Sequence, residues 1–440
     1  MPKEISFPYN YTPRWYQNNL WKYFQTGGFR RKRAVWVVHR RGGKDLNAIH
    51  LINTAGAERP GLYWHVFPTY AQGKKIAWDG KTKEGKPFRS AFPAELVEGE
   101  NNTEMKMTLK NGVIYQVIGA DKPDSLVGPN PVGIVLSEWS LMNPSVWELI
   151  KPILAENEGW ALFIYTPRGK NHGLKQLNVA KKNSIDKGGR WFWEVLPNSY
   201  TGVVSQADIE TERAEGMSDE MIEQEFECSF DSPLEGSYYG KLIEAAEKEK
   251  RITRVPWEPR LVVNTSWDLG IGDYMSIWFY QQIGLETRVI DYYENTGEGL
   301  AHYAKICKDK PYVYGVHLAP HDIQVREIGT GKSRLEVAKG LGIRFRPGRQ
   351  LPIDEGIEAV RGLLPKCYFD ETKCELGLDA LRSYHKEWDE ERRVFRDKPE
   401  HDWSSHAADS FRELAQGLKI PIKKNNLQKK AVAEYNPLDA

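Results

Sequence analysis

A basic, glycine-containing turn follows the first β-like apolar run of this chain. The stretch VWVVHRRGGKDLNAIHLI covers residues 35–52, and the part after the turn HRRGGKD is typical of a helix. In a phosphate-binding loop, glycines let backbone N–H groups approach phosphate oxygens, the next helix directs its positive end at them, and a lysine bridges the terminal phosphates. Gly42, Gly43 and Lys44 are the residue types that this chemistry needs. The turn therefore predicts a nucleotide site.

The turn departs from the usual GxxxxGK[ST] pattern at two positions. Val38 stands where the first glycine is expected. Asp45 stands where a serine or threonine normally supplies a hydroxyl for Mg²⁺. An ordinary strand–turn–helix connection is therefore an alternative reading of the turn by itself.

A second segment favours the nucleotide site. GIVLSEWS, residues 133–140, is a short apolar run that leads to Ser137 and Glu138. ATPases normally carry here an aspartate that holds Mg²⁺, followed by a glutamate that activates water. The two departures complement each other, because the turn offers a carboxylate, Asp45, and the strand offers a hydroxyl, Ser137. We hypothesise that the two groups have exchanged places, so that one carboxylate and one hydroxyl still reach Mg²⁺.

Further polar residues have candidate roles in the same chemistry. Glu138 is the candidate general base for the attacking water, unless it is a strand-end carboxylate in a surface salt bridge. Arg40 or Arg41 is placed to stabilise charge on the γ-phosphate, although either could anchor the turn instead. Thr166, after the apolar run ALFIY, is placed to sense the γ-phosphate or to form a turn. Gln17 could pair with an adenine edge or lie on the polar face of an amphipathic helix.

Three aspartates of the second half occur on separate predicted elements. Asp268 ends a strand-like run, Asp322 follows a later run, and Asp409 lies on the last predicted helix. Cutting a phosphodiester with two metal ions needs carboxylates from separate elements that converge on ions roughly 4 Å apart. The three acids predict such a nuclease centre, whereas each one alone is compatible with a cap or a turn. Asp273 is a candidate fourth ligand.

Several neighbours of these acids are weaker candidates for the same centre. Two acids lie on the third strand of this region, and another precedes the last helix. Three histidines in the same segments could tune the centre, although loop histidines are more often structural. These residues are Asp291, Glu294, Asp402, His321, His401 and His406.

Apolar runs in the first half predict the strands that position the nucleotide residues. Their near-continuous hydrophobicity is typical of strands buried on both faces, and the helix-like stretches between them favour a parallel α/β sheet. After residue 203 the sequence becomes charged and helix-periodic, which predicts a small helical subdomain. The runs cover residues 33–39, 62–67, 113–119, 133–138 and 161–167.

The second half predicts a different sheet. Three strands joined by short turns indicate an antiparallel meander. A helix, a strand, a helix, a short strand and further helices follow, which is the ribonuclease-H-like order at the level of fold analogy. The strands are expected at residues 261–270, 275–282, 286–294, 312–320 and 343–347, and the helices near residues 299–309, 333–340, 353–364, 376–388 and 404–418.

The length of 440 residues exceeds what one hydrophobic core usually organises. We expect a P-loop ATPase domain over residues 1–203 and a helical linker or lid over residues 204–254. A ribonuclease-H-like nuclease domain is expected over residues 255–420, and a basic flexible tail over residues 421–440.

Composition limits the classes of function. Lys plus Arg numbers 61 against 60 for Asp plus Glu, so any nucleic-acid contact must depend on a local basic surface. The four cysteines are too few and too scattered for a disulfide framework, and they form no CxxC pair. Neither a cationic leader with an apolar segment nor an apolar run of about 18 residues occurs, so we expect a soluble intracellular protein.

The motifs taken together resemble a known family. HRRGGKD, GIVLSEWS, YTPRG, GSYYG, SWDLGIGD, PHDI and HDWSSHAADSFR occur in this order over nearly the whole chain. This combination resembles the large terminase subunit of tailed bacteriophages. The resemblance implies an ATP-driven motor that moves double-stranded DNA through a portal into a procapsid. It also implies a nuclease that cuts the concatemer, a small terminase subunit, a ring-shaped homo-oligomer, and the cytoplasm of an infected bacterial host.

The same resemblance implies the cofactors and which residues serve the motor and which serve the nuclease. ATP with Mg²⁺ serves the motor, and Mg²⁺ or Mn²⁺ serves the nuclease. The motor residues are then Lys44, Arg40 or Arg41, Asp45 and Glu138, with Thr166 in a coupling motif, and the nuclease residues are Asp268, Asp322 and Asp409.

Two rival functions remain open from the sequence. An ATP-dependent helicase-nuclease that acts on free DNA would keep both centres but would need no portal. A non-catalytic assembly scaffold would keep only the fold.

Overall fold

The computed structural model describes residues 5–121, 126–231, 236–270, 274–325, 331–389 and 394–418. The chain divides into two compact units. The first consists of Met1–Ala245 and Glu375–Ser405, and the second of Ala246–Cys374 and His406–Ala440. The domain boundaries expected from the sequence, after residues 203, 254 and 420, stay a prediction. The expected tail, residues 421–440, lies outside the described residues.

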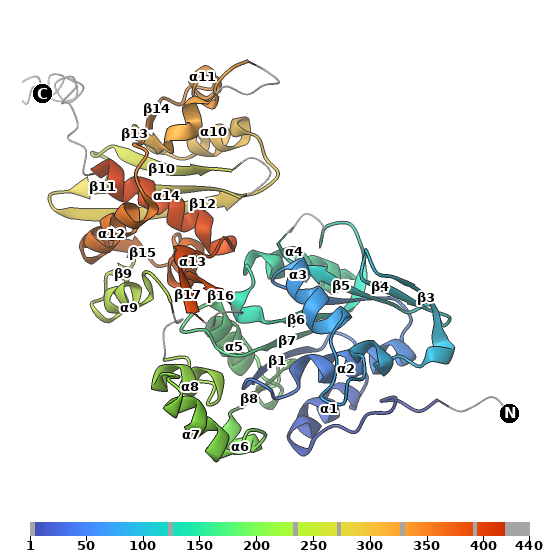
Figure 1. The fold of residues 1–440 in the computed structure, drawn as a ribbon. Helices are drawn as coiled ribbons and strands as arrows, with labels where there is room; N and C mark the ends of the chain where they lie inside the picture. The colour runs from blue at the N-terminus through green and yellow to red at the C-terminus, as the bar shows by residue number, and fades with distance from the viewer. Residues whose placement is uncertain are drawn as a thin grey trace, which may run out of the picture. The chain divides into compact units, whose positions relative to one another are not determined.

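The first unit contains an eight-stranded sheet with the order β3-β4-β5-β2-β6-β7-β1-β8. The six strands from β5 to β8 are parallel to one another, and β3 and β4 add an antiparallel edge (Figure 1). The strands are β1 (Arg33–Val38), β2 (Leu62–Phe67), β3 (Val97–Asn101), β4 (Lys106–Leu109), β5 (Ile114–Gly119), β6 (Pro131–Ser137), β7 (Trp160–Tyr165) and β8 (Trp191–Leu196).

Helices cover both faces of this sheet, which explains the continuous hydrophobicity of its central strands. Every residue of β1 and β7 is buried. Alternate residues of β1 pack into two cores, one shared with α1 and α2 and the other with α4 and α5. The helices are α1 (Asn18–Gln25), α2 (Lys44–Glu58), α3 (Tyr70–Gly73), α4 (Ser145–Glu156) and α5 (His172–Lys182). The predicted parallel α/β fold is confirmed.

A group of short helices follows β8, as the charged periodic sequence predicts. Ser205 and Ser218 cap α7 and α8, because their hydroxyls accept the N–H groups of Asp208 and Met221. Ile209, Ile222 and Phe226 form a small core of their own. The helices are α6 (Asn198–Thr201), α7 (Gln206–Ala214), α8 (Asp219–Glu225) and α9 (Gly240–Lys248).

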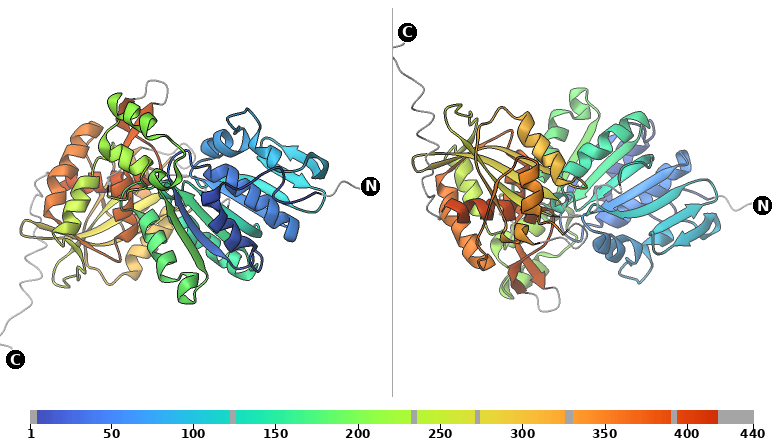
Figure 2. Two further views of the ribbon diagram at one scale, coloured as in Figure 1. Left: turned by 90° about the horizontal axis from the view of Figure 1, so that it is seen from below. Right: turned by 90° about the horizontal axis from the view of Figure 1, so that it is seen from above.

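The second unit contains a seven-stranded sheet with the order β14-β13-β10-β11-β12-β15-β9 (Figures 1 and 2). β10, β11 and β12 form an antiparallel meander, and β13 pairs with β10 in parallel. This arrangement confirms the predicted ribonuclease-H-like fold. The strands are β9 (Ile252–Thr253), β10 (Val263–Leu269), β11 (Met275–Ile283), β12 (Glu286–Asn295), β13 (Tyr314–Ala319), β14 (Phe345–Pro347) and β15 (Cys367–Asp370), and the helices are α10 (Leu300–Asp309), α11 (Arg334–Gly340), α12 (Ile353–Leu363) and α14 (Trp403–Leu418).

One predicted helix is shorter than expected. Instead of a helix over residues 376–388, α13 (Glu375–Ser383) ends early, and β16 (Lys386–Asp389) pairs with β17 (Val394–Pro399). The alternation of KEWD is compatible with a strand, and pairing with β17 decides in its favour. The sequence analysis also missed β3, β4, β8, β9 and β15.

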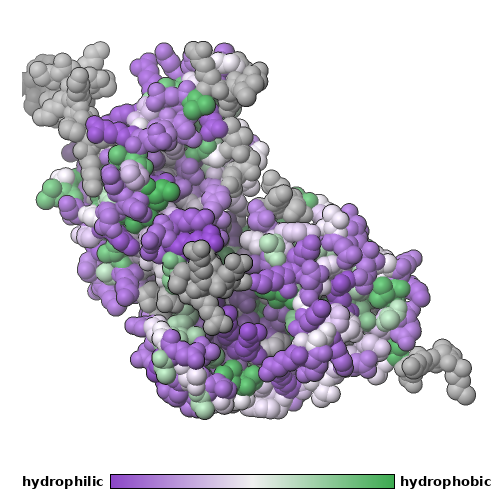
Figure 3. All heavy atoms as spheres, in the orientation of Figure 1, coloured by the Kyte–Doolittle hydropathy of each residue, from purple (hydrophilic) through white to green (hydrophobic). Residues whose placement is uncertain are grey.

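The face of the molecule drawn in Figure 3 is mainly polar. On the face drawn in Figure 3, hydrophilic residues predominate and apolar residues appear as scattered patches. Along the described ranges, no helix combines the length and the apolar character needed to cross a lipid bilayer.

Candidate functional site

The turn after β1 has the backbone of a phosphate-binding loop. Gly43 has a φ of +77°, a left-handed conformation that glycine adopts without strain, and it immediately precedes α2. A Cβ atom on Gly42 would lie 2.3 Å from Cγ1 of Val38, so only glycine fits there. The loop thus exposes backbone at the N-terminus of a 15-residue helix, where N–H groups and the helix dipole favour an anion.

Lys44 links the loop to the end of β7. Its Nζ atom donates a hydrogen bond of 2.9 Å to Oγ1 of Thr166, whose hydroxyl donates to the carbonyl of Val38 at 2.9 Å. Both side chains are buried. Because β1 and β7 are parallel neighbours, their carboxyl ends meet at one edge of the sheet. The structure therefore brings together two residues that the sequence places 122 positions apart.

Asp45 and Ser137 are in direct contact. The Ser137 hydroxyl donates a hydrogen bond of 2.5 Å to Oδ1 of Asp45. Burial alone would raise the pKa of Asp45, but the contact with His65, the charge of Lys44 and the Ser137 hydrogen bond together lower it. A carboxylate and a hydroxyl are oxygen donors that suit Mg²⁺, so the pair fits the chemistry of a magnesium ligand set.

Glu138 lies directly beyond the end of β6 in a strained backbone conformation. Its φ of +53° is in the left-handed region, which non-glycine residues rarely adopt and which is often found at active sites. Its Oε1 atom is 3.7 Å from Nζ of Lys44, and 19% of its side chain is exposed. The turn after the strand therefore directs this carboxylate toward the loop rather than toward a distant surface partner.

The two candidate arginines have different surroundings. Arg40 donates its backbone N–H to the carbonyl of Glu225 on α8, and its guanidinium is 3.6 Å from the Glu225 carboxylate. Arg168 forms a close ion pair with the same carboxylate. Burial raises the pKa of Glu225, but the charges of Arg168 and Arg40 outweigh it and keep the pKa low. Arg41 has a φ of +68° and is exposed.

Gln17 lies beside the loop, but its oxygen has partners already. Oε1 accepts the Tyr11 hydroxyl at 2.6 Å and the Arg14 backbone N–H at 2.9 Å. Its Nε2 atom is 3.5 Å from the position that a Cβ atom on Gly43 would occupy. An amide oxygen has two lone pairs, so only the amide N–H group of Gln17 can address a further ligand in this conformation.

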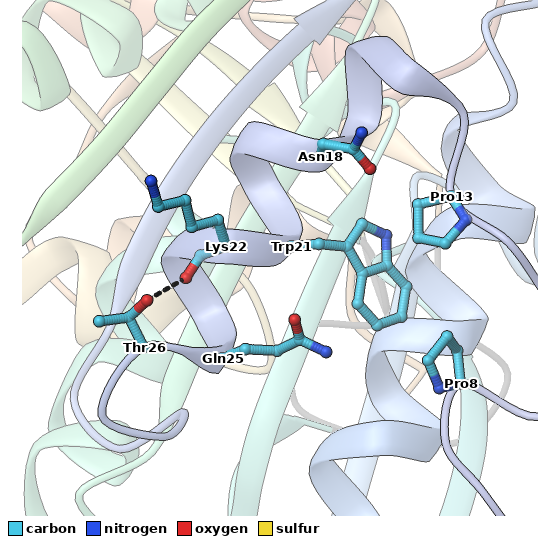
Figure 4. A pocket seen from close by; sticks show the side chains of 7 residues that line it. All are labelled: Pro8, Pro13, Asn18, Trp21, Lys22, Gln25 and Thr26. Carbon is cyan, nitrogen blue, oxygen red and sulfur yellow. Dashed lines mark hydrogen bonds between the residues drawn. The ribbon is translucent and has the colours of Figure 1, made fainter.

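An open pocket lies elsewhere in the first unit, along one side of α1 (Figure 4). Its Trp21 indole donates to Oδ1 of Asn47 on α2 at 2.7 Å. No residue predicted for chemistry lines it, and it receives no assignment. The lining residues are Pro8, Pro13, Asn18, Trp21, Lys22, Gln25 and Thr26.

In the second unit, two of the three predicted aspartates lie at the same edge of the sheet. Asp268 is next to last in β10. Asp322 lies in a short 3₁₀ turn directly after β13. Because β10 and β13 are parallel, both side chains belong to elements that end at the carboxyl edge of the sheet.

α14 brings the third aspartate to this sheet by packing through small side chains. The Ser266 hydroxyl of β10 donates to the carbonyl of Ser410 at 2.5 Å. The Ser276 hydroxyl of β11 is 2.7 Å from the Ser410 hydroxyl, and Trp278 donates to the carbonyl of Ala407 at 2.8 Å. These contacts hold α14 against β10 and β11, and Asp409 is next to Ser410 in the sequence of this helix.

Glu413 on α14 is under the electrostatic influence of all three predicted aspartates. Burial raises the pKa of Glu413 to about 7, and the charges of Asp268, Asp409 and Asp322 also raise it, although Arg412 opposes them. Glu413 is one helical turn beyond Asp409, so both can lie on one face of α14. The i, i+4 spacing was available in the sequence, yet the sequence analysis missed this acid.

The predicted acids within the described ranges are not arranged as the ligands of one metal ion. Within the described ranges, no three His, Cys, Asp or Glu side chains are close enough to hold one metal ion. His406 Nδ1 lies 3.1 Å from Oδ2 of Asp268, and Arg412 forms an ion pair of 2.7 Å with Asp409. The predicted fourth ligand, Asp273, lies outside the described residues.

The acids named as weaker candidates for the metal centre have other partners. Asp291 accepts from Nζ of Lys310 at 2.5 Å. Glu294 accepts the Tyr292 hydroxyl at 2.5 Å. In the first unit, Asp402 accepts the backbone N–H of Ser404 at 2.9 Å and so caps α14. Among the candidate histidines, His406 contacts a predicted aspartate, Asp268.

Comparisons with known proteins place the chain beside one group of viral proteins. No family model matches the chain. A large terminase subunit of Thermus virus P23-45 is 45% identical over 184 residues, which cover 38% of this chain and 36% of that protein. The chain thus spans little more than a third of the length of that relative.

A second relative aligns over more of the chain. A large terminase subunit of Escherichia phage T5 is 23% identical over 340 residues, or 72% of each protein. Among solved structures, the large terminase ATPase domain of Thermus phage P74-26 covers 51% of this chain and 99% of its own, with 21% identity and a TM-score of 0.41. The curated relatives bear out the resemblance carried by the motifs, and the chain is related to the large terminase subunits of bacteriophages.

Proposed function

We propose that this chain is the ATP-hydrolysing motor subunit that moves double-stranded DNA into a viral procapsid, and that its second unit cuts concatemeric DNA. The convergence of Lys44, Asp45, Ser137, Glu138 and Thr166 at one edge of a parallel sheet carries the proposal. These residues come from three separate segments, and a loop that only connected a strand to a helix would require none of them.

The first unit would bind the triphosphate through the loop and α2. Backbone N–H groups around Gly42 and Gly43 would bind the phosphate oxygens, and Lys44, which now donates to Thr166, would pair with the terminal phosphates. Asp45 and Ser137 would hold Mg²⁺, which neutralises charge on the phosphates when it is bound. Glu138 orients the attacking water and accepts its proton.

Arg40 and Arg168 are candidates for linking hydrolysis to movement. Arg168 follows Thr166 by two residues, and both arginines contact Glu225 on α8. A change at the γ-phosphate that moves Thr166 would therefore reach the helical segment through this shared carboxylate. Either Arg40 or Arg41 stabilises the charge that develops on the γ-phosphate, as the sequence analysis expected.

The second unit would hold divalent metal through Asp268, Asp322 and Asp409. The parallel pairing of β10 and β13, whose carboxyl ends carry Asp268 and Asp322, supports this assignment. Divalent ions, Mg²⁺ or Mn²⁺, supply an activated water and stabilise the leaving oxygen when they are bound. Asp268 and Asp409 would hold the ions in place of their present partners His406 and Arg412, which keep the two carboxylates oriented.

The proposal includes the partners that packaging requires. They are double-stranded DNA, a portal on a procapsid, a small terminase subunit and further copies of this chain in a ring. The place of action is the cytoplasm of an infected bacterium. DNA contacts are made to phosphates, because a packaging motor moves along any base sequence.

Crossed single substitutions in the full chain test the two activities. Lys44→Ala should lower kcat/KM for ATP about 100-fold or more, because it removes the cation that bridges the phosphates. It should leave the linearisation of a supercoiled plasmid in Mg²⁺ or Mn²⁺ unchanged. Asp268→Ala should give the opposite result. Equal plasmid cutting by wild type and Asp268→Ala would remove the nuclease assignment, and normal ATP hydrolysis by Lys44→Ala would remove the motor assignment.

Two measurements separate the proposal from its rivals. Binding to a portal that stimulates ATP hydrolysis supports packaging, whereas ATP-dependent unwinding of free DNA without a portal supports a helicase-nuclease. A chain that shows neither hydrolysis nor cutting in the presence of duplex DNA and partners is a scaffold.

A further inference from the structure

His65 is a buried histidine on β2 that faces the phosphate loop. The residue is fully buried. Its Nε2 atom is buried and has no hydrogen-bond partner within the described part of the chain. Oδ1 of Asp45, a charged group, lies 3.6 Å from Nε2. A buried ring nitrogen without a hydrogen-bond partner costs free energy of folding, so its position calls for a functional explanation.

The Asp45 carboxylate that faces Nε2, together with the Tyr115 hydroxyl at Nδ1, favours one position for the ring proton. Nδ1 of His65 is 3.2 Å from the hydroxyl oxygen of Tyr115. Burial raises the pKa of Tyr115, so its hydroxyl stays protonated and can donate to Nδ1. In a neutral imidazole that accepts at Nδ1, the proton is on Nε2. The N–H group therefore points at the Asp45 carboxylate, whereas the other tautomer would aim a lone pair at a negative charge.

The strand holds His65 rigidly in this direction. β2 lies between β5 and β6, and His65 is in register with Val117 and Val135 of these neighbours. Its ring also packs against Phe67, with centroids 4.6 Å apart. A side chain fixed by a central strand positions a neighbouring group more accurately than one on a loop.

We infer that His65 is a positioning residue that holds the Asp45 carboxylate for nucleotide binding. Ser137 and His65 approach the same oxygen, Oδ1, from the protein side, which leaves Oδ2 for the ligand. A serine at position 45 needs no such partner, because its short side chain carries no charge. The carboxylate has an extra rotatable bond and repels phosphates, so donors behind it are required. The inference rests on the proposed nucleotide site.

Two substitutions of His65 separate a hydrogen-bonding role from packing. The amide nitrogen of Gln reaches the place of histidine Nε2, whereas that of Asn reaches only the place of Nδ1. His65→Asn should weaken the binding of a fluorescent ADP analogue to the full chain about tenfold, as expected when a buried polar group that faces a carboxylate is lost. His65→Gln should restore most of the affinity. The melting temperature of each variant without nucleotide controls for folding.

A double-mutant cycle then tests whether the effect passes through Asp45. In an Asp45→Ser background, His65→Asn should change ADP affinity less than twofold, because the group that His65 holds is gone. An equal loss with Asn and Gln, or the same tenfold loss in both backgrounds, would overturn the inference. Failure of the nucleotide site itself gives a different result, since Lys44→Ala would then bind the analogue as tightly as the wild type.

Discussion

The contact between Asp45 and Ser137 gives the exchange of their roles a physical basis. The two side chains share a hydrogen bond of 2.5 Å, so a group placed at one position acts in the same small volume as a group at the other. The usual arrangement, with a hydroxyl on the loop and a carboxylate on the strand, would fill the same volume with the same two groups. If the two residues have exchanged roles, two substitutions should reverse the exchange.

Asp45→Ser alone should abolish ATP hydrolysis, because two hydroxyls and no carboxylate would remain beside the metal. The double variant Asp45→Ser with Ser137→Asp should regain part of the lost rate, measured as phosphate release by the full chain. The single variant Ser137→Asp, which places two carboxylates together, is the matched control and should be inactive. Normal hydrolysis by Asp45→Ser would show that the carboxylate has no role in the reaction.

The strand β6 must lie close to β7 if Glu138 is to face the loop. Gly133 makes this approach possible, because a Cβ atom there would lie 2.3 Å from Nε1 of Trp160. Trp160 is almost fully buried and pairs with Gly133 in register. Neither a bulky residue at position 133 nor a shifted indole fits this core without displacing the strand that carries the acid.

Gly133→Ala should lower the free energy of unfolding by about 1–3 kcal/mol, the usual cost of overpacking a core. It should also reduce ATP hydrolysis more than plasmid cutting, since β6 belongs to the first unit. Gly99→Ala on the edge strand β3 is the control, because no atom lies within 4 Å of a Cβ atom there. Chemical denaturation of both variants checks the prediction, and equal stability of the two would contradict it.

At the scale of the whole molecule, charge limits how DNA can be held. The formal net charge is +1, so long-range attraction by the bulk charge is negligible, and binding depends on local contacts between Lys or Arg side chains and phosphates. Such contacts release counterions from DNA and are largely independent of base sequence.

Binding to a random-sequence duplex should therefore weaken steeply with salt. With six or more phosphate contacts, the affinity should fall on the order of 10³-fold between 50 and 200 mM salt. Fluorescence anisotropy with two duplexes of unrelated sequence measures this dependence, and their slopes on a log–log plot should agree. A shallow slope, or a strong preference for one duplex, would argue against a translocating motor.

Local sequence determined much of this protein. The burial of β1 and β7 on both faces, the meander from β10 to β12 and the glycines of the loop follow from periodicity and residue type, which act over a few neighbouring positions. The same local rules misjudged the region after α13, because KEWD becomes a strand only when it pairs with β17. The edge strand β3 was missed since its largely exposed residues carry little apolar pattern. Its neighbour β4, in which buried residues alternate with partly buried ones, was missed because a run of four residues is too short for alternation to be recognised.

The sequence by itself determined the fold class and the residue types that could do chemistry. Tertiary structure alone decided which of them meet. Lys44 meets Thr166, and Asp45 meets Ser137 and His65, because parallel pairing brings the ends of distant strands to one edge. Sequence periodicity does not predict these contacts, because they depend on the order of the strands in the sheet. The packing of the whole unit sets that order.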